Sequence, residues 1–174
     1  MEQENNKDFV HYAEMDETTF WKLIDESRTY SSEINDWFDR LGDLLRKLSP
    51  KQIVGFRLTM DRLRSGLKYS IISYLDFDGL PEDQRPSGYA IECFIISMGR
   101  ERYYSIKDRV SEFFNPSNDT WALESVYRYE KFDQSSEIFQ EKTGENPDKY
   151  IEAYHRLEEL EQNKEQDNDQ EMEQ

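Results

Sequence analysis

The sequence predicts an all-α fold, a single globular domain of six to eight helices, and three observations support this. Apolar residues recur at helical spacing along most of the chain, and several of these stretches begin at a residue that caps helices. Clean strand-like alternation never extends beyond about four residues. At 174 residues, the chain is long enough for one domain with a sizeable core.

The first two helices are predicted over residues 17–30 and 33–48. Asp16 stands where an N-cap is expected, and the apolar residues that follow in "FWKLIDESR" share one helix face. The stretch "EINDWFDRLGDLLRKL" repeats this spacing. Both segments therefore read as amphipathic helices that turn one face to the core.

The third helix has the clearest start in the sequence. Ser49 is placed as the N-cap, Pro50 as the first helical residue, and Gln52 completes the pattern of a capping box. We predict that one face of this helix, which carries Ile53, Phe56, Met60, Leu63, Leu67 and Ile71, lies in the core.

The remaining helices are predicted from the same kinds of signal. The nearly all-apolar "YAIECFIISMG" is expected to form the central helix, and "DFDGLPEDQRPSG", residues 76–88, the longest internal loop. Asn146 and Pro147 are expected to cap a last helix that docks through Tyr150, Ile151, Tyr154 and Leu157. The other predicted helices are 100–114, 120–131 and a short one ending at Gly144.

The charge is concentrated at the two ends of the chain. The formal net charge is −16; residues 158–174 contribute −7 and residues 1–19 contribute −5, which leaves −4 for the rest. We therefore divide the chain into a polar N-terminal segment, 1–14, an all-helical domain, 15–157, and an acidic tail, 158–174. The tail has few apolar residues to offset the entropy of ordering, so we expect it to be disordered.

Four motifs together resemble a bacterial family of all-helical proteins known as a domain of unknown function. They are "FWKLIDESR", "LSPKQIVGF", "ISMGRE" and "FQEKTG", and they span about residues 15–145 in the family's order. The family opens with an FW-x-LID motif and carries a Gly-Arg-Glu triplet after its central helix. The resemblance implies an all-α fold and brings no catalytic residues.

The third helix is unusually basic for so acidic a chain. Arg57, Arg64 and Lys68 lie at the edge of its apolar face. One interpretation is structural: the stems cover the core, and the charged groups pair with Asp25, Glu26 or acids of the 76–83 loop. The alternative is an exposed patch for an acidic partner, joined by Arg100 and Arg102.

Few residues point to catalysis. Cys93 lies in an apolar run, far along the chain from both histidines, and the sequence has no nucleotide-binding glycine loop, no metalloprotease motif and no calcium loop. We expect no catalytic residues, no metal and no cofactor. An enzyme that uses Asp25, Glu26, Arg100 and Glu101 in a cleft between helices is the least favoured hypothesis.

The favoured hypothesis is a non-catalytic protein-binding domain with a basic protein partner, such as an immunity or inhibitor protein for a bacterial toxin. A regulatory protein that binds nucleic acid through its basic helix ranks second, because the net charge repels phosphate. A single cysteine and the absence of a long apolar run predict a cytoplasmic protein that does not bind membranes. The oligomeric state is not set by these patterns.

Overall fold

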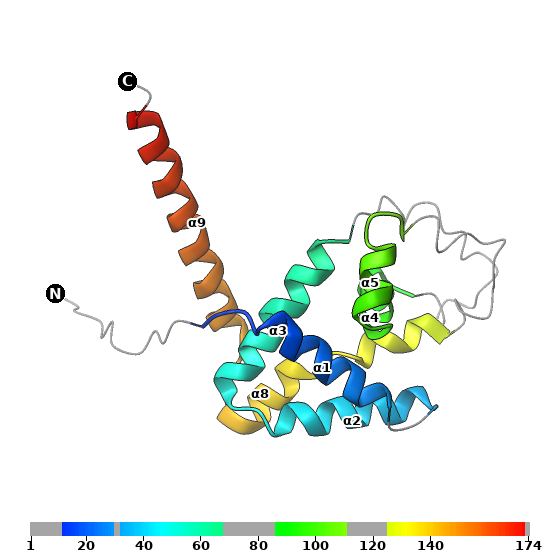
Figure 1. The fold of residues 1–174 in the computed structure, drawn as a ribbon. Helices are drawn as coiled ribbons and strands as arrows, with labels where there is room; N and C mark the ends of the chain where they lie inside the picture. The colour runs from blue at the N-terminus through cyan, green and yellow to red at the C-terminus, as the bar shows by residue number, and fades with distance from the viewer. Residues whose placement is uncertain (1–11, 30–31, 68–85, 111–124, 173–174) are drawn as a thin grey trace.

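The computed structural model describes residues 12–29, 32–67, 86–110 and 125–172, with side chains as far as residue 164. Within these ranges it contains seven α-helices, one 3₁₀-helix and no strand, which confirms the all-α prediction (Figure 1). The elements are α1 (Glu17–Arg28), α2 (Ile34–Arg46), α3 (Pro50–Ser65), α4 (Gly88–Ser97), α5 (Arg100–Ile106), η2 (Tyr127–Lys131), α8 (Ser135–Thr143) and α9 (Asp148–Met172).

The predicted helix starts are confirmed at α1 and α3. The Asp16 carboxylate accepts a hydrogen bond from the Thr19 amide at 2.9 Å, as an N-cap does. Ser49 and Gln52 form the full capping box, with Pro50 as the first helical residue. These local bonds satisfy amide groups that the first turn of a helix leaves without a partner.

Helix α3, and not the predicted 89–99 helix, lies at the centre of the fold. It packs against α1, α4, α8 and α9, whereas α4 lies between α3, α5 and η2. The core combines the apolar face of α3 with aromatic rings from several helices, and Phe20 of α1 stacks on Phe56 at 4.8 Å between ring centroids. High hydropathy made the 89–99 segment look central, but the number of neighbouring helices depends on topology.

Residues just before the predicted boundary at residue 15 also pack on the helical domain. Tyr12 packs on Tyr150 of α9, with 4.7 Å between ring centroids, and the Met15 amide donates to the Gly55 carbonyl at 2.9 Å. A Cβ atom at Gly55 would lie 2.8 Å from the Ala13 carbonyl oxygen. Glycine is therefore needed in "LSPKQIVGF" so that the incoming chain can cross α3 closely.

Two predicted helices differ from the observed elements. Of the helix predicted over 100–114, residues Arg100–Ile106 form α5 and give way to a turn, although nothing in the sequence of 107–109 marks a break. Residues 111–114 lie outside the described part of the chain. Of the helix predicted over 120–131, residues 120–124 lie outside the described residues, and Tyr127–Lys131 form a 3₁₀-helix. Buried Val126, Tyr129 and Phe132 explain this, because residues three apart share a side of a 3₁₀-helix.

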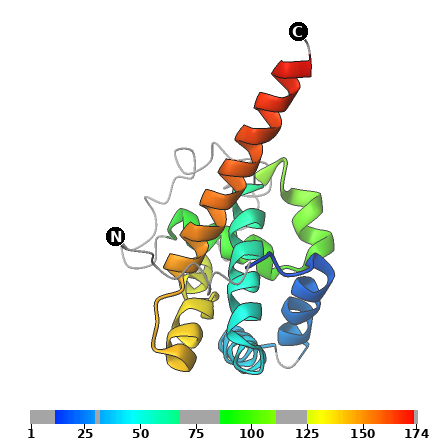
Figure 2. The same ribbon diagram turned by 90° about the vertical axis from the view of Figure 1, so that its left-hand side faces the viewer.

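Helix α9 is longer than predicted and leaves the body of the molecule (Figures 1 and 2). Tyr150, Ile151 and Tyr154 pack on the core as expected, but Leu157 is exposed. The helix passes the predicted boundary at residue 157 and continues to Met172. Glu, Gln and Lys are good helix formers, so a helix already started by docking extends through them at little cost.

Candidate functional site

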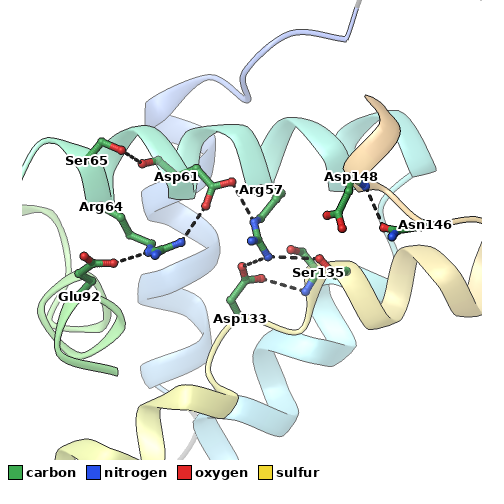
Figure 3. Close-up of polar contacts among 10 residues, drawn as sticks. Arg57, Asp61, Arg64, Ser65, Glu92, Asp133, Ser135, Asn146 and Asp148 are labelled. Atoms are coloured by element: carbon green, nitrogen blue, oxygen red, sulfur yellow. Dashed lines mark hydrogen bonds and ion pairs between the residues drawn. The ribbon is translucent and has the colours of Figure 1, made fainter. Parts of the chain in front are cut away.

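Five charged side chains form a chain of ion pairs beneath α3, which we call the α3 charge network: Glu92, Arg64, Asp61, Arg57 and Asp133 (Figure 3). Arg64 contacts Glu92 at 2.6 Å and Asp61 at 2.9 Å. Arg57 contacts Asp61 at 3.0 Å and Asp133 at 3.1 Å. The network joins α3 to α4 on one side and to the start of α8 on the other.

The α3 charge network is largely removed from solvent. The Asp133 side chain is 0% exposed, and its second oxygen accepts from the Ser135 amide at 2.9 Å. Burial alone would lower the pKa of the Arg57 guanidinium, but Asp133 and Asp61 outweigh it, so this pKa is raised. The pKa of Arg64 is likewise raised, because Glu92 outweighs burial. Both arginines therefore stay charged.

Internal pairing of the basic helix is confirmed for Arg57 and Arg64, but Asp25 and Glu26, two of the predicted partners, do not take part in it. The acids are Asp61, Asp133 and Glu92, and not Asp25 or Glu26. The interpretation of Arg57 and Arg64 as members of an exposed basic patch is also wrong, because their side chains are only 22% and 21% exposed.

Two candidates fall outside the residues that the structure describes. These are Lys68 and the 76–83 loop that was expected to pair with the basic helix. The predictions for them stay open.

Cys93 lies beside the α3 charge network and is buried, as predicted. Burial, and after it the negative charge of Asp133, raises the pKa of its thiol. Tyr89 covers the same region, with the Arg64 guanidinium 4.3 Å from its ring centroid. A buried thiol that resists ionisation is a poor nucleophile, so this geometry fits a packing role.

A second group of polar side chains surrounds the carboxylate of Glu17 at the start of α1. Its carboxylate accepts from the Tyr104 hydroxyl at 2.6 Å, from the Trp21 indole at 3.1 Å and from Arg62 at 3.1 Å. Arg100 approaches it at 4.0 Å. Burial by itself would raise the pKa of Glu17, but these donors outweigh it and the pKa is lowered.

The FW-x-LID and Gly-Arg-Glu motifs meet in space. Arg28, which ends α1, donates to the Met98 carbonyl at 2.6 Å. Gly99 has φ +87°, and a Cβ atom there would lie 2.8 Å from both Arg28 Nη1 and Asp25 Oδ1. The glycine of the second motif is therefore needed for its backbone angle and for close approach to the first. This contact gives both motifs a structural role.

The four residues of the enzyme hypothesis have different surroundings. Asp25 lies beside Gly99, Glu26 pairs with Arg40 of α2 at 2.9 Å, and Arg100 faces Glu17. Glu101 is exposed on α5.

The remaining candidate, Arg102, is exposed on α5. Arg100 and Arg102 are thus the members of the proposed basic patch that are exposed to solvent in the described part of the chain.

The described side chains leave three large hydrophobic groups exposed. Tyr104 is 42% exposed, Leu157 41% and Leu160 55%. The two leucines lie one turn apart on α9, where the helix has left the body, and Glu159 and Glu161 beside them are exposed as well. Sequence reasoning placed Leu157 in the core and did not single out Leu160.

No group of three or more His, Cys, Asp or Glu side chains in the described ranges of the chain is arranged to hold a metal ion. None of the helices in the same ranges combines the length and the apolar character needed to cross a membrane.

Residues 15–142 match the model of a family described as "Protein of unknown function (DUF4240)". The chain belongs to this family. The match covers three of the four motifs in full and the first four residues of "FQEKTG", and it reaches from α1 to the next-to-last residue of α8. It confirms the resemblance drawn from the sequence. Neither a curated protein nor a solved structure matches the chain. The projecting part of α9 lies beyond the region that the family model covers.

Part of the site was visible in the sequence and part was not. Asp61 lies four residues after Arg57 and three before Arg64, a spacing that brings side chains together on a helix. Asp133 and Glu92 are 76 and 28 residues from their arginine partners. No local pattern marks such distant pairs, so they could not have been predicted from spacing.

Proposed function

We propose that this protein is a non-catalytic binding domain whose partner is a more basic protein, with an immunity or inhibitor protein as the concrete form. The observation that carries the proposal is the α3 charge network, in which Arg57 and Arg64 pair with internal acids. Because Arg57 and Arg64 are paired within the domain, the net charge offered to a partner is dominated by the −16 excess.

The sign of the surface charge favours a cationic partner. An excess of negative charge speeds encounter with a basic protein and slows encounter with a polyanion such as nucleic acid. Internal pairing of Arg57 and Arg64 weighs against the nucleic-acid alternative, which needs these side chains at phosphates. Arg100 and Arg102 alone make a small basic surface.

The enzyme alternative has less support from the geometry. Glu26 and Arg100 have different ion-pair partners, and the raised pKa of the Cys93 thiol disfavours nucleophilic chemistry. The proposal places the binding in the cytoplasm of a bacterium, where a lone buried cysteine stays reduced.

An affinity experiment tests the proposal. The full chain is immobilised, exposed to a lysate of the cells from which it comes, and compared with an unrelated protein of equal net charge. We expect one protein of basic isoelectric point at near-equal stoichiometry, with an affinity that falls as salt is raised. Retention of nucleic acid in its place, or of nothing beyond the control, would refute the proposal.

A further inference from the structure

The exposed apolar surface of the described residues is concentrated on α9. Leu157 and Leu160 are 41% and 55% exposed, and Tyr104 on α5 is the other exposed large hydrophobic side chain among the described residues. Two leucines one turn apart on a projecting helix leave apolar area in water that folding of this domain does not bury. Their position indicates a surface that a partner covers.

This apolar surface continues the face by which α9 docks on its own domain. At about 100° per residue, Leu157 lies about 20° around the helix from Tyr150 and about 60° from Tyr154. Tyr150 packs on Phe139, with 5.6 Å between ring centroids, and Tyr154 packs on the core. Leu157 thus continues the docking face, whereas Leu160 lies about 80° from Tyr150 and about 120° from Tyr154. Helix α9 itself runs past the edge of the body (Figure 2).

Acidic residues lie on the same turns of α9 as the exposed leucines. Glu159 and Glu161 are exposed, while Glu158 accepts from the Tyr154 hydroxyl at 2.8 Å. Residues 158–174 carry eight acids and one lysine. A second copy of the chain would bring two such segments together with strong repulsion, whereas a basic partner gains from both the apolar contact and the charge.

We infer that α9 is the docking element for the basic partner: it inserts its Leu157–Leu160 face into an apolar groove whose rim carries Lys and Arg. Helix-in-groove recognition uses apolar anchors at this spacing, and acids beside the anchors meet the basic rim. The inference rests on the proposed function and adds the site and the partner's surface chemistry. The family match ends at residue 142, before α9 begins at Asp148. The docking element is therefore separate from the helical body that the family shares.

The affinity of variants for the purified partner tests this inference. L157S/L160S removes the apolar anchors, and we expect binding to weaken at least about tenfold. E159Q/E161Q keeps the leucines and is expected to slow association about threefold or more at low salt, with little effect at high salt. H155A/Q162A is the matched control, because both residues lie about 140° to 160° around the helix from the leucines; its affinity should equal that of the wild type.

The outcomes separate this inference from the proposed function. If the wild type binds a basic protein and L157S/L160S binds equally well, α9 is not the docking element and only the inference fails. If the wild type retains no protein, both fail. Weakening by L157S/L160S without weakening by H155A/Q162A supports the inference, provided that circular dichroism finds equal helicity in the two variants.

A photo-cross-linking residue identifies the occupant directly. Placed at position 160, it is expected to attach to the partner, and at position 162 it is expected not to. A cross-link from 160 to a second copy of the chain would overturn the assignment of a basic partner.

Discussion

Helices α3 and α9 both carry many charges, but they use them in opposite ways. On α3, Arg57 and Arg64 are about four-fifths buried and paired with acids from three different elements. On α9, Glu159 and Glu161 are exposed beside Leu157 and Leu160. The charges of α3 hold the domain together, whereas those of α9 are available to another molecule.

The difference shows that charge density along a sequence is a poor guide to a working surface. In the sequence, the basic stretch on α3 resembles a binding patch. In the structure it lies at the edge of the core, where its arginines pair with acids that are largely buried. The acidic stretch on α9 reads as a solubility tail, yet its first turns carry exposed apolar side chains. Location relative to the core decides the role of each.

The largest expected effect comes from breaking the α3 charge network. D133A removes a side chain that is 0% exposed and leaves Arg57 with Asp61 as its remaining acid in the network. We expect the free energy of unfolding to fall by about 3 kcal/mol. Urea denaturation measures this, with E159Q on α9 as a control expected to change by less than about 0.5 kcal/mol. Equal effects of the two variants would contradict the comparison.

A smaller effect is expected where the two family motifs meet. G99A places a Cβ atom at φ +87° and 2.8 Å from Arg28 and Asp25, and should cost about 2 to 3 kcal/mol. Gly144 has φ +74° but open space around it, so G144A should cost only about 1 kcal/mol. Thermal unfolding of both variants measures the contact between motifs together with the backbone of Gly99, whose ψ of 171° lies in a region open essentially to glycine, whereas Gly144 has ψ 6°. Similar losses would mean that neither the contact nor this backbone region sets Gly99 apart from an ordinary left-handed glycine.

Glu17 predicts a pH dependence of stability. Its pKa in the folded protein lies below the ordinary value of 4.5, so folding favours the carboxylate. The resulting stabilisation is present above about pH 4.5 and is lost as the pH falls through the lowered pKa. E17Q removes this pH-dependent stabilisation, so the melting temperatures of wild type and E17Q should converge as the pH falls below about 4.5 and through the lowered pKa of Glu17. A constant difference over this range would exclude the linkage.

The smallest effect is expected for the exposed face of α9. L157S/L160S should change the free energy of unfolding by less than about 0.5 kcal/mol, because neither leucine is part of the core. The same variant is expected to lose affinity for the partner, so stability and binding respond separately. A loss of more than about 1 kcal/mol in urea denaturation would place this face in the domain's own packing.

The sequence by itself determined the features that depend on neighbouring residues. Capping by Asp16 and by Ser49 with Gln52, the helical spacing of apolar residues, and the helix end at Gly144 are all confirmed. Each results from bonds and side-chain positions within one or two turns, which a short stretch of sequence specifies completely.

Only the tertiary structure decided which distant groups meet. The partners of Arg57 and Arg64, the central place of α3 and the 3₁₀ geometry of Tyr127–Lys131 depend on how helices pack. So does the exposure of Leu157, which has helical spacing suited to a core position. Local patterns give the face on which a side chain lies, but whether that face is covered depends on where the helix ends relative to the rest of the domain.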